Sequence, residues 1–305
     1  MQPKDLPVWR SLLFVPVNVD RFVDKAHTRG ADAIQLDLED SIPPGEKDAA
    51  RARVQEAAKK VARGGADVVV RINRPWRLAL KDLEATISPL VQAVALPKVD
   101  SGDHVRMIDE VVSELERERG MEVGTTKFIA MVETAPAFFR AAEIAAASPR
   151  VVALTLGAED FALSVGMLPE PEGLLYPQIH IVIAARAAGI LPLGFVGTVA
   201  EYRDMEALRA TIRRSRRLGF MGASAIHPDQ VRVLNEEFRP TEEEVAHARR
   251  VIAAYEEAQA AGRGAITVDG QMVDIPIVER ARQVLKRHEA ILRREAQARA
   301  GGDPV

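Results

Sequence analysis

Residues 33–41 read Ala-Ile-Gln-Leu-Asp-Leu-Glu-Asp-Ser, a short apolar run that ends in three carboxylates within four residues. The apolar run predicts a buried strand. Because side chains alternate along a strand, Asp37 and Glu39 should share a face, while Asp40 leaves at the strand end. Clustered carboxylates repel one another and lose hydration on burial, and a divalent cation compensates both effects efficiently. The alternative is a solvated turn that caps the next helix, since Asp and Ser are ordinary N-caps.

Seven further apolar runs have the length and composition of strands. They cover residues 10–16, 67–73, 93–98, 127–134, 151–157, 190–196 and 222–228. Helical patterns lie between or beside them at 19–29, 46–63, 103–119, 136–147, 176–188 and 203–218. Eight strands that alternate with helices predict an α/β fold, a (β/α)8 TIM barrel, over residues 1–235. A doubly wound open sheet is the alternative, although no G-x-G-x-x-G follows the first strand.

Residues 236–305 have the pattern of a C-terminal helical extension. A strong helix is expected over 241–260, opened by Thr241 with Glu244 three residues later, which is the pattern of a capping box. A small loop over 262–270 and a last helix over 276–299 should follow. We therefore expect a catalytic barrel domain followed by a helical extension.

The composition excludes several classes of protein. With 47% hydrophobic and 28% charged residues among 305, the chain is typical of globular proteins. Its formal net charge of −3 provides no basic field for nucleic acid or an anionic membrane. The absence of cysteine excludes disulfides, thiolate nucleophiles and cysteine-based zinc sites. Because no apolar run resembles a signal peptide or a membrane span, we expect a cytoplasmic protein with neither nucleic acid nor membrane as a partner.

Polar side chains gather where the predicted strands end. These residues are Glu39, Asp40, Arg71, Asn73, Lys98, Glu133, Glu159, Asp160 and His227. In a (β/α)8 barrel the carboxyl ends of all strands meet at one mouth, where catalysis takes place. Several acids with two or three bases at one mouth indicate a metal-assisted site. Carboxylates without cysteine, and without a histidine pair at helical spacing, favour Mg2+ or Mn2+.

Three basic residues at the strand ends allow more than one interpretation. Arg71, on a strand that should be buried, needs an anionic partner, which is either Glu39 or Asp40, or a substrate carboxylate. Lys98 is either a structural ion pair or a group of the mouth, and the acid-rich surroundings argue against a Schiff-base role. His227 precedes a proline at a strand end, where a structural imidazole is favoured over a metal ligand.

Several short motifs resemble those of one family. In order they are RSLLFVP from residue 10, LDLEDS from 36, RIN from 71, LPK from 96, VET from 132, GAED from 157 and GFMGASAIHP from 219. Together, over about residues 10–285, they resemble the citrate lyase beta-subunit-like family, which includes malyl-CoA and citramalyl-CoA lyases. The resemblance implies a TIM barrel with a C-terminal extension, assembled as trimers or hexamers. It also implies Mg2+-dependent cleavage or formation of a C–C bond beside a CoA thioester.

The resemblance also implies roles for single residues. Glu133 and Asp160 match the family's direct metal ligands, and Glu39 and Asp40 match acids that hold metal-bound waters. Arg71 matches the arginine that faces the 2-oxo acid. Lys98 is placed beside it as a second group that binds the ligand.

Asp274 matches an aspartate that reaches into a neighbouring subunit's site and is proposed there as the acid/base. From the residues alone, Asp274 would instead be the N-cap of the last helix. The substrates expected from the resemblance are a CoA thioester and a 2-oxo acid. Two other functions stay open: a metal-dependent 2-oxo acid aldolase without CoA, and a citrate lyase beta subunit that acts with an acyl-carrier partner.

The sequence departs from the family pattern at three places. Val17-Asn18 and Ala135-Pro136 stand where glycines are common, after the first strand and beside the expected metal ligand Glu133. Ala223 stands where a lysine is common, so CoA binding would have to use other cations. The arginines between 213 and 217 are candidates for this role, although a solvated helix face is the simpler interpretation.

Overall fold

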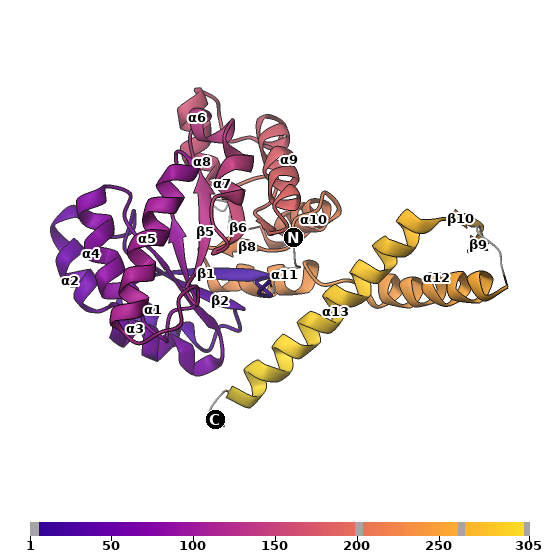
Figure 1. Ribbon diagram of the computed structural model, residues 1–305, viewed down its shortest axis with the longest axis horizontal. Helices are drawn as coiled ribbons and strands as arrows, with labels where there is room; N and C mark the ends of the chain where they lie inside the picture. The colour runs from indigo at the N-terminus through magenta and orange to yellow at the C-terminus, as the bar shows by residue number, and fades with distance from the viewer. Residues whose placement is uncertain (1–5, 199–203, 262–265, 302–305) are drawn as a thin grey trace. The chain divides into compact units, whose positions relative to one another are not determined.

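The computed structural model describes residues 6–198, 204–261 and 266–301. Eight parallel strands form the centre of the first compact unit, and helices surround them (Figure 1). The strands are β1 Ser11–Pro16, β2 Ala33–Asp37, β3 Asp67–Arg71, β4 Ala93–Leu96, β5 Lys127–Val132, β6 Val151–Leu156, β7 Leu191–Leu193 and β8 Ala223–Ala225. Their order in the sheet, β7-β6-β5-β4-β3-β2-β1-β8, follows the chain except that β8 pairs with β1.

The sheet closes into a barrel between its two short end strands. Leu193 of β7 forms a parallel bridge with Gly222, and the Gly194 N–H donates to the Gly222 carbonyl at 2.8 Å. Side chains alternate between two layers along a strand: Val69 of β3 faces the barrel interior, whereas Val68 and Val70 pack against the helices. The predicted (β/α)8 barrel is thus confirmed.

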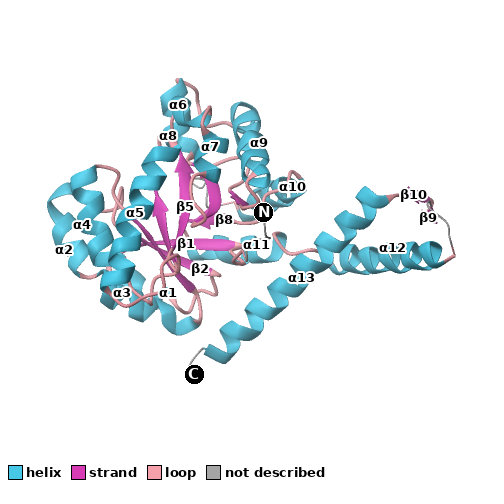
Figure 2. Ribbon diagram, in the orientation of Figure 1, coloured by secondary structure: helices cyan, strands magenta, loops and turns pink. Residues whose placement is uncertain are grey.

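Figure 2 shows helices on the outside of these strands. Their bounds are α1 Asp20–Ala26, α2 Lys47–Ala52, α3 Val54–Val61, α4 Trp76–Thr86, α5 Gly102–Glu118, α6 Ala135–Phe138, α7 Ala141–Ala146, α8 Ala158–Val165, α9 Pro171–Ala187, α10 Met205–Arg217 and α11 Pro228–Glu237. Two short 3-10 turns, η1 Pro44–Glu46 and η2 Ala62–Gly64, flank α2 and α3. The helix expected over 46–63 is interrupted at Arg53, and α4 and α11 were not expected from the sequence.

The second compact unit begins at Arg239. It contains the long helices α12 Glu242–Ala260 and α13 Ile275–Gly301 and, between them, a hairpin of β9 Ile266–Val268 and β10 Gln271–Val273. Part of the loop expected over 262–270 is thus a strand. Asp269 and Gly270 both adopt positive φ (53° and 79°) and make the tight turn that Asp-Gly favours, which allows the hairpin to form. The capping box of Thr241 and Glu244 is present.

Along the described residues, no helix combines the length and the apolar composition needed to cross a bilayer.

Candidate active site

The strand ends bring six of the seven predicted site residues to one mouth of the barrel, where ion pairs link them. They are Glu39, Asp40, Arg71, Lys98, Glu133 and Asp160. The seventh, Asp274, belongs to the second unit. There it is exposed and precedes α13, and its carboxylate accepts from the Ile277 N–H at 3.4 Å, as an N-cap does.

Arg71 is held by Asp37, a residue that we left without a role from the sequence. Both carboxylate oxygens of Asp37 accept from the guanidinium, from Nε at 2.8 Å and from Nη2 at 2.8 Å. The register explains this pair, since Asp37 of β2 lies directly opposite Arg71 of β3. Burial alone would raise the pKa of Asp37, but the hydrogen bonds and the charge of Arg71 outweigh it and lower this pKa. Phe14 lies under the guanidinium, with 4.8 Å from Cζ to the ring centroid.

Glu39 and Asp40 extend this ion pair toward the cavity. Glu39 Oε2 lies 3.0 Å from Arg71 Nη1, and Asp40 Oδ2 lies 3.7 Å from it. Glu39 is buried, whereas Asp40 is exposed. The backbone of this acidic loop is fixed from behind, because Lys47 Nζ donates to the carbonyls of Leu38 (2.8 Å) and Glu39 (2.5 Å).

Lys98 lies at the centre of the acids. Its Nζ is 2.6 Å from Glu39 Oε1, 3.6 Å from Asp40 Oδ1, 3.8 Å from Glu133 Oε2 and 3.9 Å from Asp160 Oδ1. Burial opposes its charge, but the hydrogen bond and charge of Glu39 and the other acids raise the pKa of Lys98 above its usual value. Lys98 is thus a charged group of the mouth.

Glu133 is the least satisfied of the carboxylates. It is 2% exposed, and its Oε1 has no hydrogen-bond partner in the part of the chain that the structure describes. Burial, with repulsion from Glu39, raises its pKa to about 8. Gly157 permits this position, because a Cβ there would lie 2.5 Å from Glu133 Cγ.

The acid pair fits a hard divalent cation. Asp160, in the first turn of α8, is partly exposed and aims a carboxylate oxygen at the same ammonium as Glu133 does. Within the described residues no three acidic or histidine side chains converge as a metal shell. Mg2+ is ordinarily held by one or two carboxylates, with water and substrate oxygens completing its octahedron. The buried, unsatisfied Glu133 and the adjacent Asp160 suit that pattern.

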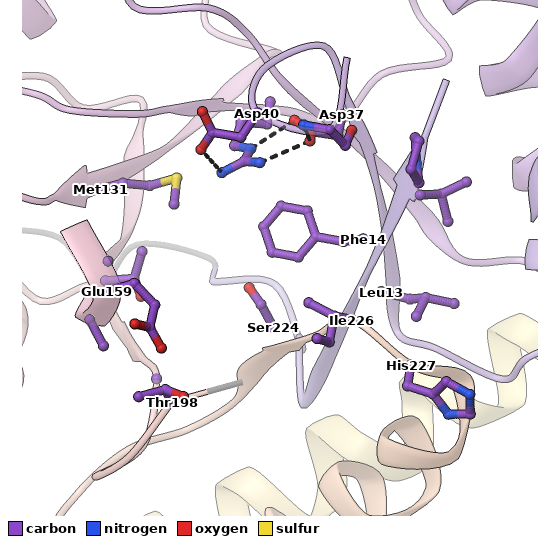
Figure 3. Close-up of a pocket in the computed structure, with 18 of the residues that line it drawn as sticks. Leu13, Phe14, Asp37, Asp40, Met131, Glu159, Thr198, Ser224, Ile226 and His227 are labelled. Atoms are coloured by element: carbon purple, nitrogen blue, oxygen red, sulfur yellow. Dashed lines mark hydrogen bonds and ion pairs between the residues drawn. The ribbon is translucent and has the colours of Figure 1, made fainter. Parts of the chain in front are cut away.

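A cavity of about 850 Å3 extends from these acids across the mouth toward β1 and β8. Figure 3 shows Asp37 and Asp40 on one side of it and Glu159 and Met131 on another. The ring of Phe14 lies in the middle, near Ser224. Three cations spaced four residues apart line it: Arg21 and Lys25 of α1, and Arg29 in the turn that follows this helix, together called the basic face of α1. We did not predict this basic face, although the four-residue spacing of the cations was visible in the sequence; the helix expected over 19–29 ends at Ala26.

Other residues singled out in the sequence have structural partners. His227 is the N-cap of α11, where its Nδ1 accepts from the Asp229 N–H at 3.3 Å, although the residue also lines the cavity. Arg213 of α10 pairs with Glu237, with 3.0 Å from Nε to Oε2, so this arginine belongs to a helix–helix ion pair.

Known proteins resemble this chain over most of its length. The profile of the HpcH/HpaI aldolase/citrate lyase family matches residues 10–228. Citrate lyase subunit beta of Leuconostoc mesenteroides subsp. cremoris is 39% identical over 91% of this chain and 92% of that protein. The L-malyl-CoA/beta-methylmalyl-CoA lyase of Cereibacter sphaeroides is 36% identical over 92% of this chain and 95% of that one.

Solved structures of citrate lyase-type proteins also resemble this chain. CitE of Mycobacterium tuberculosis, in complex with magnesium, acetoacetate and coenzyme A, superposes with a TM-score of 0.72 at 30% identity, over 93% of this chain and 99% of that one. A citrate lyase of Burkholderia xenovorans LB400 superposes with a TM-score of 0.79 at 22% identity, over 95% and 93% of the two chains, which supports the fold.

Proposed function

Because the chain belongs to the HpcH/HpaI aldolase/citrate lyase family, we propose that it is a Mg2+-dependent lyase acting on a 3-hydroxyacyl-CoA such as malyl-CoA or citramalyl-CoA. The products would be acetyl-CoA and a 2-oxo acid. Carbon–carbon lyase chemistry is common to the curated relatives, and the chain is an enzyme of this class. The observation that carries the CoA-ester proposal is that one cavity contains both the acids Glu133 and Asp160 and the basic face of α1.

Glu133 and Asp160 would hold the metal. When bound, Mg2+ (or Mn2+) supplies a Lewis acid that stabilises negative charge on the substrate oxygens. Glu39 and Asp40 would orient the water molecules bound to the metal. Their carboxylates lie around the ammonium of Lys98, as do those of the proposed ligands Glu133 and Asp160.

Arg71 would face the 2-oxo acid. Asp37 fixes two of its nitrogens, so the guanidinium cannot swing away, and Nη1 stays directed at Glu39 and Asp40 beside the cavity. A fixed cation there attracts the substrate carboxylate and stabilises negative charge on the substrate oxygen that becomes the carbonyl oxygen of the 2-oxo acid. Its rigidity reduces the cost of reorganisation during the reaction.

The basic face of α1 would bind the phosphates of CoA. Arg21, Lys25 and Arg29 line the same cavity as the acids, so one extended ligand can reach both ends. These cations would replace the lysine that the family often has at the position of Ala223, which is buried in β8. Clustered arginine and lysine side chains suit phosphate groups.

Asp274 would act in a neighbouring copy of the chain, as the acid/base that takes the proton of the 3-hydroxyl group in the cleavage direction. It is exposed, and the exposed apolar residues Met272 and Ile275 flank it. Exposed apolar side chains on both sides of a polar group are typical of interface segments. We therefore propose a homo-oligomer, a trimer or a hexamer.

A substrate matrix tests the reaction. Acetyl-CoA and propionyl-CoA are each incubated with glyoxylate, pyruvate or oxaloacetate and Mg2+, and condensation is followed by loss of the 2-oxo acid and formation of the 3-hydroxyacyl-CoA thioester. At least one pair should react, and chelation of the metal should stop it. Glu133→Ala and Asp160→Ala should each lose at least a hundredfold in kcat while keeping the fold. Normal turnover by either variant would contradict the metal assignment.

The aldolase without CoA is the second candidate, and ligand-induced stabilisation separates the two. A ligand that binds only the folded state raises the melting temperature. CoA should stabilise the wild type and Arg213→Ala, but should stabilise Lys25→Ala and Arg29→Ala much less. If CoA stabilises none of them while a free 2-oxo acid is cleaved, the aldolase is favoured.

The high identity to citrate lyase beta subunits favours a third possibility, action beside an acyl-carrier partner. Cleavage of a CoA ester by the purified chain alone would exclude a requirement for that partner. Activity only after addition of an acylated carrier protein would support it.

A further inference from the structure

We propose that Lys98 is a charge-balancing residue that competes with the divalent cation for the mouth carboxylates and enables the anionic 2-oxo acid to bind. This inference rests on the metal site of the proposed function and adds a role for a residue outside the ligand pair. It predicts effects of opposite sign on two ligands when the charge of Lys98 is removed.

The first support is the position of the ammonium. Its distances to four carboxylates lie between 2.6 and 3.9 Å, and two of these carboxylates are those of Glu133 and Asp160. A divalent cation held by the same two residues therefore lies within a few ångströms of the ammonium. Two cations at such a distance repel each other strongly, even in a partly hydrated site.

The second support is the backbone that holds Lys98 there. Lys98 has φ of 47°, and Asp269 in a hairpin turn is the other non-glycine residue with positive φ in the described ranges. This left-handed conformation is unfavourable for a side-chain-bearing residue. Arg74 stabilises it, since its Nε donates to the Lys98 carbonyl at 3.1 Å while its Nη2 pairs with Asp100 at 2.5 Å. A strained backbone with its own anchor indicates that the position of the ammonium is built into the fold.

The third support is the charge of the whole mouth. Five carboxylates, those of Asp37, Glu39, Asp40, Glu133 and Asp160, face two cations, Lys98 and Arg71. Arg71 is already bound on two nitrogens by Asp37. An anionic 2-oxo acid entering this mouth meets an excess of negative charge, which a single Mg2+ does not fully neutralise. With Mg2+ bound, these groups still leave one net negative charge, and without Lys98 they would leave two, so Lys98 lowers the repulsion that the 2-oxo acid meets.

The experiment measures binding rather than turnover. Isothermal titration gives the dissociation constant of Mg2+ for metal-free protein, and then that of pyruvate at saturating Mg2+. The variants are Lys98→Met, which keeps the length of the stem, and Lys98→Arg, which keeps the charge. The matched control is Lys47→Met, because Lys47 is also a lysine beside the acidic loop but its ammonium donates to backbone carbonyls.

Lys98→Met should bind Mg2+ at least tenfold more tightly than the wild type, because the competing cation is gone. It should bind pyruvate at least tenfold more weakly. Lys98→Arg should stay close to the wild type for both ligands. Lys47→Met should change the Mg2+ constant much less than Lys98→Met does, because its ammonium does not lie among the metal-facing oxygens.

Weaker or unchanged Mg2+ binding by Lys98→Met would overturn the proposal, since loss of a merely structural ion pair loosens the site for both ligands. Tighter Mg2+ binding with unchanged pyruvate binding would overturn the part that concerns the 2-oxo acid. If the wild type itself binds no Mg2+, the proposed metal site fails, and this result is distinct from either outcome for Lys98.

Discussion

At the scale of single residues, two neighbouring strand ends fix the geometry of the mouth. Asp37 accepts two hydrogen bonds from Arg71, and both side chains are largely withdrawn from water (2% and 13% exposed). A buried cation that loses its partner keeps its desolvation cost without compensation. The pair is therefore important both for stability and for holding the guanidinium at the cavity.

Asp37→Asn should lower the free energy of unfolding by about 3 kcal/mol, because Arg71 stays buried beside a neutral amide. Asp40→Asn is the matched control, since Asp40 is 60% exposed and lies 3.7 Å from the same guanidinium. It should cost less than about 1 kcal/mol. Urea denaturation of the metal-free protein measures the free energy of unfolding of both variants. Equal losses of unfolding free energy in the two variants would show that the bidentate pair with Asp37 contributes no more to stability than the exposed Asp40 does.

His104 makes the stability depend on pH. It is buried in α5 against Trp76, and burial, with repulsion from Arg74, lowers its pKa to about 4. The unfolded chain, with a pKa near 6.5, binds the proton first, so this contribution is present above pH 6.5 and is lost as the pH falls from 6.5 toward 4. Between pH 7 and 5 the wild type should lose about 2 kcal/mol more than His104→Phe does. Parallel pH curves of the two proteins would contradict this.

Single residues also show where sequence reasoning stops. The sequence offered Glu39, Asp40 or a substrate carboxylate as the partner of Arg71, and it did not indicate Asp37, because that pair depends on the register between two strands. Likewise, Lys98 was recognised as a mouth residue or an ion pair. Its place among four carboxylates follows from strands β2, β4, β5 and α8 together, and from a left-handed backbone that no spacing reveals.

At the scale of elements, the eight strands could be predicted because each is a short apolar run ended by polar or breaker residues. Helix α4 was missed although its sequence, WRLALKDLEAT, has helical spacing, and α11 was missed because Pro228 was read as a strand end rather than as the first helical residue. The basic face of α1 looks like a solvated helix face in the sequence. Only the packing of α1 beside β1 shows that it lines a cavity.

The closure of the barrel depends on a glycine. A Cβ at Gly222 would lie 1.7 Å from the carbonyl oxygen of Trp9, where β8 joins β1 and meets β7. Gly222→Ala should therefore force the strands apart and lower the free energy of unfolding by about 3 kcal/mol. Gly45→Ala, where nothing lies within 4 Å of the added Cβ, should be neutral or slightly stabilising. Thermal unfolding compares the two, and similar melting temperatures would argue against a close-packed junction.

At the scale of the whole molecule, the seven predicted site residues belong to two different compact units. Six belong to the unit that ends at Phe238, and Asp274 belongs to the unit that begins at Arg239. The sequence could indicate the helical extension from its patterns. It could not indicate from spacing which barrel Asp274 serves, because this depends on how copies of the chain assemble, and the N-cap role explains the residue equally well within one chain.

Subunit mixing tests that assembly directly. Glu133→Ala and Asp274→Ala should each be inactive alone. If Asp274 serves a neighbouring copy, co-expression in equal amounts yields oligomers in which some sites combine an intact Glu133 with a neighbour's intact Asp274. Random assembly in a ring makes that combination at about a quarter of the sites, so about a quarter of the wild-type turnover should return. Different affinity tags on the two variants verify that mixed oligomers form. Mixed oligomers without turnover would mean that each Asp274 serves its own chain, because then no site could recover both residues.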